Sequence, residues 1–291
     1  MFVTLPEFEY HRPQTVSAAL DLLDQYGGGS TVMAGGTDLL VDMRYRIRVP
    51  EHVIDLKGIE ELGKLTFQPG NGLVIGAAVT LNRLLEYDAV QSRFGALHDA
   101  LEDMCDDQVR NRATLAGNLC TASPAADCAP PLLVFDAKVE VASPAGRRMV
   151  DLPDLFTGVK ETSLGRDEMV TAVHIPEPPL DAQSRYLKGK RSSEDCAIVG
   201  VAALVARWDD PRDRVVRLAY SSVAPTPVRV YDVERIFKQD KPWGDLVEEA
   251  VSAALNRVSP ISDVRSSKEY RVHLIDVLTR LALRELLGGR R

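Results

Sequence analysis

The chain has 291 residues, of which 45% are hydrophobic and 26% charged, the composition of an ordinary globular protein that is long enough for two domains. Its formal net charge of -7 argues against nonspecific binding to nucleic acid or to anionic membranes. The longest apolar run, residues 197–206, is too short to span a bilayer, and the N-terminus carries no secretory signal, so we expect a cytoplasmic protein without a transmembrane segment.

Hydrophobic periodicity and turn residues predict alternating strands and helices along the first part of the chain. Thr15 has the character of a helix N-cap, and the glycines at 27–29 end that helix. The expected elements are, in order, a helix from residue 16, a strand over 31–34, a helix over 39–47 capped by Thr37 or Asp38, strands over 52–56 and 73–79, a helix capped by Thr80, a helix over 94–104, and strands over 137–141 and 169–175.

The strand over 31–34, the glycines that follow it and the strand over 52–56 are similar to a dinucleotide-binding βαβ unit. Asp55 even falls where a ribose-binding acid would lie. The full Gly-x-Gly-x-x-Gly pattern is missing, however, and position 38 is an aspartate. A Rossmann unit is therefore an open but disfavoured interpretation.

The pattern changes after the proline cluster at 176–179, which is the best domain boundary in the chain. Three strands follow, with a turn at 209–211, and then two helices; Ser266 and Glu269 form a capping box for the last helix, which is expected to run to Gly288 and Gly289. Strands followed by helices indicate an α+β domain with an antiparallel sheet. The predicted strands cover 185–190, 197–208 and 214–223.

The chemistry-bearing side chains form few motifs. The four cysteines are scattered, without a Cys-x-x-Cys pair, which argues against a disulfide framework or a structural zinc site: Cys105, Cys120, Cys128 and Cys196. A cluster built from these distant cysteines stays geometrically possible. His174 is interpreted as an ordinary strand residue. The chain has no Gly-x-Ser-x-Gly elbow and no Walker loop, which weakens a hydrolase or ATPase interpretation.

Two loops of small residues carry the functional signal. Residues 111–127 are rich in small side chains and hydroxyls and close on the carboxylate of Asp127, and a second such loop lies upstream at 34–38. Small side chains let a ligand approach the backbone, whose free N–H groups can hold phosphate oxygens. Two loops of this kind indicate a dinucleotide held from both sides, whereas Gly35 and Gly36 alone could equally form a plain turn.

Together with residues 75–80 and 188–199, in this order and spacing, the two loops resemble the FAD-binding subunit of the molybdenum hydroxylases, the family of xanthine oxidase and carbon monoxide dehydrogenase. The resemblance covers essentially the whole chain. It implies an α+β fold with a two-lobed FAD-binding domain of the vanillyl-alcohol-oxidase (PCMH) type over 1–176, with lobes at about 1–56 and 57–176. A C-terminal domain over 177–291 would hold a three-stranded antiparallel sheet with helices.

The resemblance also implies individual roles. Residues 32–39 would wrap the FAD pyrophosphate, and the N–H groups of residues 35–38 would donate hydrogen bonds to it. The eight residues of this segment are Val32, Met33, Ala34, Gly35, Gly36, Thr37, Asp38 and Leu39. The same cleft would be lined by Ala77 and Thr80. Phosphate and ribose would be held from the opposite side by Ala113, Thr114, Gly117, Asn118 and Thr121, and a side chain at Gly117 would displace FAD because its N–H would meet a phosphate.

At the flavin end, Asp127 would bind near the sugar or flavin tail, and Val170 and Lys188 would lie beside the isoalloxazine ring. A lysine there would favour the reduced, anionic flavin. Without the resemblance, Lys188 would be interpreted as a solvated strand lysine and Asp127 as a helix cap or loop acid. Cys196 stands where relatives often carry a larger residue, which would leave that face of the flavin more open.

The implied function is electron transfer within a larger enzyme. Noncovalent FAD would collect electrons from 2Fe–2S clusters on a small partner subunit and pass them to an external acceptor, while a large subunit with molybdopterin hydroxylates the substrate. The assembly would be a dimer of heterotrimers, with an exposed C-terminal sheet and the 188–191 cationic cluster near the acceptor entrance. This chain lacks the four-iron-cluster insertion of hydroxybenzoyl-CoA reductase, so it is expected to hold flavin alone. Two alternatives stay open: a stand-alone flavin oxidase or reductase of the same superfamily, and a non-catalytic binding module.

Overall fold

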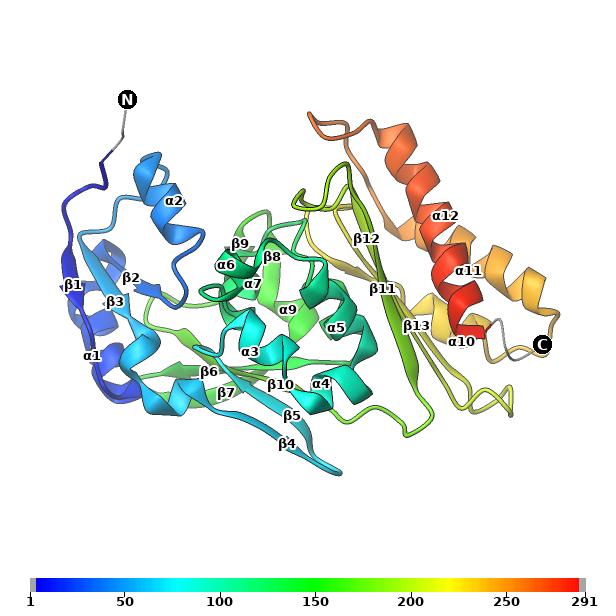
Figure 1. Cartoon of the computed structure of the whole chain (residues 1–291), viewed down its shortest axis with the longest axis horizontal. Helices are drawn as coiled ribbons and strands as arrows, with labels where there is room; N and C mark the ends of the chain where they lie inside the picture. Colours follow the sequence, from blue (N-terminus) through cyan, green and yellow to red (C-terminus); the bar gives the residue numbers. More distant parts are fainter. Residues whose placement is uncertain (1–3, 288–291) are drawn as a thin grey trace.

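The computed structural model describes residues 4–287 of the chain. Figure 1 shows a small sheet at the N-terminal end of the long axis, a central sheet with helices above it, and a further sheet with helices at the C-terminal end. A two-stranded hairpin of β8 (Phe156–Gly158) and β9 (Glu161–Thr162) lies apart from these sheets. No helix in this described part of the chain is both long and apolar enough to cross a membrane.

The first sheet is parallel, with strand order β1-β3-β2. Its strands are β1 (Glu9–His11), β2 (Ser30–Met33) and β3 (His52–Asp55). Helix α1 (Val16–Tyr26) begins as predicted, since the Thr15 hydroxyl accepts a hydrogen bond of 3.1 Å from the N–H of Ala18, and a single 3₁₀ turn (Gly27–Gly29) ends it. Helix α2 (Leu39–Arg44) connects β2 to β3 and is shorter than predicted. Asp38 precedes α2 without capping it through its side chain.

The central sheet is antiparallel, with strand order β4-β5-β10-β6-β7. Its strands are β4 (Leu65–Gln68), β5 (Gly72–Gly76), β6 (Lys138–Ser143), β7 (Gly146–Asp151) and β10 (Met169–Ile175). The short elements around it are the 3₁₀ turns Leu56–Gly58 and Glu60–Gly63 and the helices α3 (Leu81–Leu85), α4 (Asp88–Arg93), α5 (Gly95–Glu102), α6 (Asp107–Arg110), α7 (Leu115–Thr121), α8 (Ala129–Val134) and α9 (Leu152–Leu155). Helix α7 corrects the expectation of a continuous loop over 111–127.

The last sheet is antiparallel with order β11-β12-β13-β14, formed by β11 (Gln183–Gly189), β12 (Val199–Ala206), β13 (Val215–Ser221) and β14 (Val228–Arg229). Its three long strands are as predicted, and the two-residue β14 adds a fourth. The helices after it are α10 (Asp232–Ile236), α11 (Trp243–Arg257) and α12 (Lys268–Leu287). The predicted capping box is wrong by one residue, because the Ser267 hydroxyl accepts the bond of 3.2 Å from the N–H of Tyr270; Gly288 and Gly289 lie outside the described residues.

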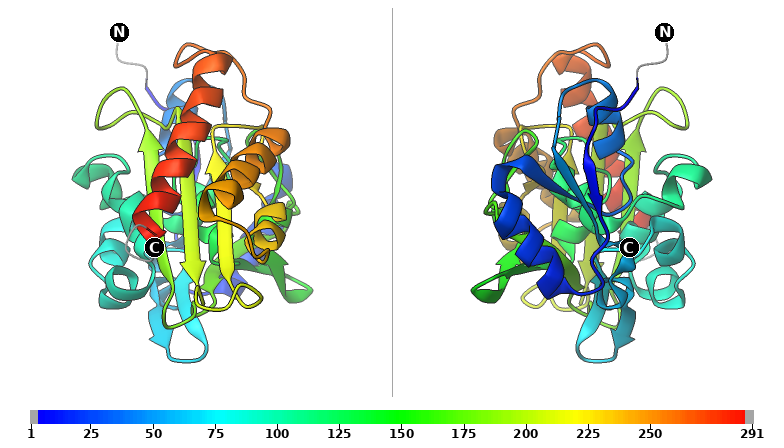
Figure 2. Two further views of the ribbon diagram at one scale, coloured as in Figure 1. Left: turned by 90° about the vertical axis from the view of Figure 1, so that its right-hand side faces the viewer. Right: turned by 90° about the vertical axis from the view of Figure 1, so that its left-hand side faces the viewer.

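The C-terminal sheet is covered on both faces, so the expectation of an exposed sheet is wrong. Helices α11 and α12 lie across its outer face (Figure 2, left), and α5 and α8 pack on its inner face. In β12 the side chains of Val199, Val201, Ala203 and Val205 join the outer core, while those of Ala202 and Leu204 join the core of the central part. Burial on both faces explains the continuous apolar run of this strand.

Candidate functional site

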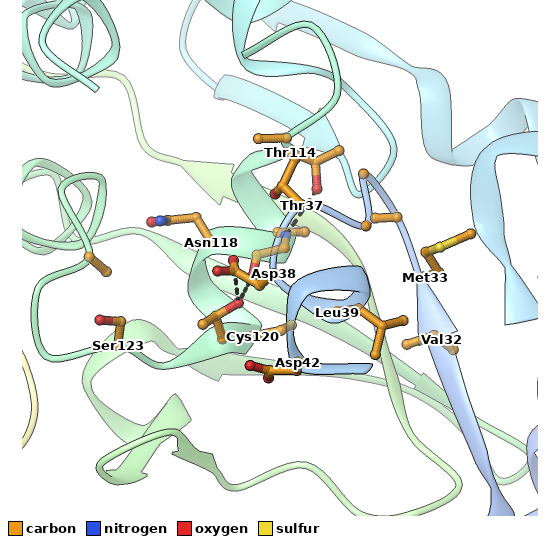
Figure 3. A pocket seen from close by; sticks show the side chains of 18 of the residues that line it. Val32, Met33, Thr37, Asp38, Leu39, Asp42, Thr114, Asn118, Cys120 and Ser123 are labelled. Carbon is orange, nitrogen blue, oxygen red and sulfur yellow. Dashed lines mark hydrogen bonds between the residues drawn. The ribbon is translucent and has the colours of Figure 1, made fainter. Parts of the chain in front are cut away.

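A cavity of about 470 Å³ separates the loop after β2 from helix α7, and its size is typical of cofactor and small-molecule sites, at about 300–1,000 Å³. Figure 3 shows Val32, Met33 and Leu39 on one wall and Thr114, Asn118 and Ser123 on the other. Ala77, Met169 and Val170 contribute from the central sheet. The two predicted loops therefore do line one cavity. Of the predicted site residues, those in the lining are Val32, Met33, Ala34, Gly35, Gly36, Thr37, Asp38, Leu39, Ala77, Ala113, Thr114, Gly117, Asn118, Thr121, Asp127 and Val170.

The loop over residues 34–38 presents backbone donors to the cavity. It follows the carboxyl end of β2, the place where open parallel sheets bind ligands. The N–H groups of residues 35–38 find no acceptor among the residues that the structure describes. Gly36 has a φ of 78°, and a Cβ at Gly35 would lie 2.0 Å from the carbonyl oxygen of Arg112, so the backbone of one loop rests directly on the other. Such a run of free N–H groups is suited to an anion.

Helix α7 forms the facing wall. The Thr114 hydroxyl caps it by accepting a hydrogen bond of 3.0 Å from the N–H of Gly117. That N–H is therefore engaged within the protein, which corrects the expectation that it meets a phosphate. Asn118 also lines the cavity, and its buried Oδ1 has no hydrogen-bond partner in the structure. The two walls touch where the Thr121 hydroxyl lies 3.1 Å from the Asp38 carboxylate.

A buried polar cluster closes one end of the cavity. The Asp127 carboxylate accepts a hydrogen bond of 2.7 Å from the Tyr186 hydroxyl and one of 2.9 Å from the Lys188 ammonium group, whose side chain is only 1% exposed. Burial raises the pKa of Asp127, although Lys188 and Tyr186 oppose the shift. The interpretation of Lys188 as a solvated lysine is thus wrong. Because Lys188 lies behind Asp127 and outside the cavity lining, it reaches the cavity only through that carboxylate.

Two other residues singled out by the sequence also lie outside the lining. The Thr80 hydroxyl caps helix α3 through the N–H of Arg83, as predicted, and its backbone forms a bridge to Thr114. Asp55 is buried and accepts hydrogen bonds from the Tyr10 hydroxyl and from Lys57, whose ammonium group also donates to the Ala34 carbonyl at 2.9 Å. Asp55 therefore does not face the cavity. It holds the Lys57 ammonium group, which in turn holds the first residue of the 34–38 loop.

Sequence reasoning missed two cations at the cavity. Arg48 and Lys160 both belong to the lining, and both lie near the Asp42 carboxylate, at 3.7 and 3.9 Å. Arg48 follows α2, and Lys160 lies in the β8–β9 hairpin with a φ of 59°. No local motif marks either residue, because the two meet only through the fold. The other predicted cations are paired: Lys190 with Asp103, and Arg191 with Asp195.

The cysteines are all free, and Cys105, Cys120 and Cys196 line the cavity. Burial raises the pKa of the Cys120 thiol to about 12 and also raises that of Cys105. A thiol with a raised pKa is a poor nucleophile, because the thiolate is the reactive form. These two side chains are therefore poorly suited to covalent attachment of a ligand.

Two family models match the chain: "FAD binding domain in molybdopterin dehydrogenase" over residues 6–178, and "CO dehydrogenase flavoprotein C-terminal domain" over residues 184–286. The chain is 34% identical to the xanthine dehydrogenase FAD-binding subunit of Escherichia coli O157:H7, over 96% of each chain. It is 32% identical to the glyceraldehyde dehydrogenase medium chain of Sulfolobus acidocaldarius, over 97% of this chain and 99% of the other. Its structure is similar to a chain of carbon monoxide dehydrogenase from Hydrogenophaga pseudoflava, with a TM-score of 0.93, 30% identity, and coverage of 98% and 99%.

Proposed function

Given that the chain belongs to the FAD-binding subunits of the molybdopterin dehydrogenase family, we propose that it binds FAD noncovalently in the cavity and transfers electrons from the iron–sulfur clusters of a partner subunit to an external acceptor. Bound FAD supplies the capacity to take up and release electrons. The chain's own residues bind the flavin nucleotide, orient it and exclude water from it. None of them needs to act as a general acid or base.

The observation that carries this proposal is the pairing of unsatisfied polar groups across the cavity. The N–H groups of residues 35–38 line one wall and lack protein acceptors, and the buried Asn118 Oδ1 on the other wall lacks a donor. Asn118 Oδ1 is buried, and a buried polar group without a partner costs about 1–3 kcal/mol, whereas the N–H groups of residues 35–38 lie in a partly exposed loop and are open to an acceptor. A diphosphate on the first wall and a ribose hydroxyl on the second would satisfy both sets at once.

The remaining roles extend this arrangement. Residues 32–39 would hold the pyrophosphate, and Ala113, Thr114, Gly117 and Thr121 would pack against the nucleotide from the facing wall. Ala77 and Val170 would support it from the central sheet, and Asp127 would accept a hydrogen bond from it. Two predicted residues would act through neighbours: Lys188 by fixing Asp127, and Thr80 by holding the backbone of Thr114.

The partners follow from the relatives, several of which are named as one subunit or chain of a multi-subunit dehydrogenase. We propose that a molybdopterin-binding large subunit and a 2Fe–2S small subunit assemble with this chain into a dimer of heterotrimers. The cytoplasmic location expected from the sequence stays a prediction. If the chain were instead a stand-alone flavin oxidase or reductase, it would need a substrate site of its own.

The binding test is the variant Asn118→Leu. It removes the unpaired amide without breaking a side-chain hydrogen bond within the protein, so the FAD-free variant should melt at the same temperature as the wild type or higher. Its FAD affinity should fall at least about tenfold, the equivalent of 1.4 kcal/mol. Unchanged affinity, measured by titrating the FAD-free protein, would remove Asn118 from the FAD site.

The electron-transfer test uses the three co-expressed subunits. The hydroxylase substrate should bleach the flavin absorbance only when all three are present, and acid precipitation should release all of the flavin into the supernatant. Equally fast bleaching of the isolated chain by a small organic substrate would favour the stand-alone enzyme, and flavin retained in the pellet would contradict noncovalent binding.

A further inference from the structure

We propose that the first sheet carries a binding site for Zn²⁺ formed by His11, His52 and Glu9. The three side chains belong to β1 and to the start of β3. The cavity lies at the opposite, carboxyl end of the neighbouring strand β2, where the 34–38 loop begins, and none of the three residues lines it. The site is therefore independent of the proposed FAD site.

The three potential ligand atoms lie at the spacing that a metal ion requires. His11 Nε2 is 3.1 Å from His52 Nδ1, and one carboxylate oxygen of Glu9 is 3.9 Å from the first nitrogen and 3.5 Å from the second. Zn²⁺ bonds to histidine nitrogen and carboxylate oxygen measure about 2.0–2.2 Å, which at a tetrahedral angle places the ligand atoms roughly 3.3–3.6 Å apart. An ion therefore fits between them with only small side-chain rotations.

The register of the sheet produces this convergence. Glu9 and His52 are direct partners in the parallel β1–β3 pair, and His11 is two residues beyond Glu9. Side chains two residues apart in a strand point to the same face, and neighbouring strands lie about 4.8 Å apart. All three side chains thus emerge on one face of the sheet, fixed by backbone pairing and not by a mobile loop.

Tyr26, the last residue of α1, restricts the two imidazoles. Its ring stacks on the His52 ring with centroids 3.7 Å apart and planes 13° apart, and on the His11 ring at 5.1 Å. The two histidine side chains are only 19% and 15% exposed, whereas Glu9 is 71% exposed. Two ligands are therefore pre-positioned, and the carboxylate is free to close over an ion from solvent.

The charge balance also suits a cation. A hydrogen bond between the two neutral imidazoles places a hydrogen on one of the two facing nitrogens. Metal binding requires that ring to take its other tautomer, with the hydrogen on the far nitrogen, so that both facing nitrogens donate lone pairs. The Glu9 carboxylate neutralises part of the charge of the ion. Three protein ligands leave one tetrahedral position for water. The bound ion would link β1, a strand of only three residues, to β3 through ligands from both strands. It would therefore stabilise the N-terminal end of the fold.

A second group with similar side chains provides a contrast. His98, Asp99 and Glu102 lie together on α5, but both Asp99 oxygens are already engaged, by the Tyr186 N–H at 3.0 Å and by Arg185 at 3.1 Å. In the first sheet, the Glu9 carboxylate has only the two histidines within ion-pair distance among the described residues. The α5 group is therefore the matched control.

The test is calorimetric titration of the purified, metal-free full-length chain with Zn²⁺, together with thermal melting. We expect one equivalent to bind and to raise the melting temperature. Loss of even an outer-shell partner of a metal ligand weakens binding about 10–100-fold, so His11→Gln and His52→Gln should each weaken it at least tenfold. His98→Gln and the exposed-site variant His273→Gln should bind as the wild type does.

Three outcomes would overturn the proposal: no Zn²⁺ binding to the wild type, binding that survives both His11→Gln and His52→Gln, or binding that His98→Gln abolishes. The melting temperatures of the metal-free variants show whether each one is folded. If His11→Gln does not fold, the exposed carboxylate provides a milder probe, because Glu9→Gln should also weaken binding. None of these results depends on whether FAD binds in the cavity.

Discussion

Gly35 lies where the two walls of the cavity touch. A Cβ there would come within 2.0 Å of the Arg112 carbonyl oxygen, which is backbone and cannot rotate away. Gly35→Ala should therefore push the 34–38 loop off the facing wall, weakening FAD binding at least about tenfold, or 1.4 kcal/mol. Titration of the FAD-free protein measures the change. Gly244→Ala is the control, since its Cβ would meet nothing within 4 Å, and equal affinities of the two variants would contradict this account.

The buried carboxyl of Asp55 should make the stability of the fold depend on pH. Burial opposes its ionisation, but hydrogen bonds from Lys57 and Tyr10 outweigh burial and lower the pKa of this carboxyl. A lowered folded-state pKa means that the ionised group stabilises the fold above its unfolded pKa and loses that contribution as the pH falls through the lower folded value. The stability difference between wild type and Asp55→Asn should therefore be constant near neutral pH and shrink in acid. A difference that grew in acid, measured by urea unfolding, would reverse the sign.

At the level of elements, helix α7 depends on its cap. Removing an N-cap hydroxyl typically costs about 1 kcal/mol, and here the cap holds the turn that carries Asn118 and Thr121. Thr114→Val should lower both the melting temperature and the FAD affinity, whereas Thr114→Ser keeps the hydroxyl and should recover most of both. Valine keeps the methyl group of threonine and loses only the hydroxyl, so a Thr114→Val variant with the melting temperature and FAD affinity of the wild type would contradict the role of the cap.

The same helix shows where sequence reasoning fails. Its sequence, Leu-Ala-Gly-Asn-Leu-Cys-Thr, belongs to a segment whose many small and hydroxyl residues are typical of a loop, and its interior glycine disfavours a helix by about 1 kcal/mol. The Thr114 cap and the burial of Leu115 and Leu119 in the central core outweigh that preference. Helices with a continuous apolar stripe, such as α1 and α11, were predicted because periodicity alone identifies them. Strands of two or three residues, such as β1 and β14, are too short to show any period.

The candidate site could likewise be predicted only in part. Glycine and hydroxyl residues mark the two loops directly, and both loops line the cavity. Arg48 and Lys160 carry no such mark, and the pairing of Asp55 with Tyr10 is invisible in the sequence because the two residues are 45 positions apart. Spatial pairing of this kind depends on the order of the strands, which no local pattern encodes.

At the scale of the molecule, the two parts on either side of residue 176 share buried polar contacts. Tyr186 reaches Asp127, and two arginines of the last sheet cap the carboxyl end of α8: Arg229 donates to the Leu133 carbonyl, and Arg217 donates to that of Val134 at 2.8 Å. Cations at a helix C-terminus satisfy carbonyls that the helix leaves free. The division at 176 stays a prediction, but these contacts indicate that the two parts fold as one unit.

Arg229→Met tests this coupling. The Arg229 side chain is 2% exposed and also pairs with Asp136 and Glu234, so the variant removes a buried donor from the Leu133 carbonyl and leaves Glu234 without its ion-pair partner, while Asp136 keeps Arg217. Both carboxylates are more than a third exposed, so most of the loss comes from the buried donor that the Leu133 carbonyl no longer has, and we expect a destabilisation of about 1–3 kcal/mol. Both tryptophans, Trp208 and Trp243, lie in the C-terminal part, so their fluorescence reports unfolding there, and FAD release reports unfolding of the cavity.

Both signals should move to lower urea concentration together in Arg229→Met, because one cooperative transition connects them. Arg212→Met is the matched control: its side chain is 91% exposed, and neither midpoint should change. A shift of the tryptophan signal alone would mean that the C-terminal sheet unfolds independently and that the arginine contacts to α8 do not couple the two parts.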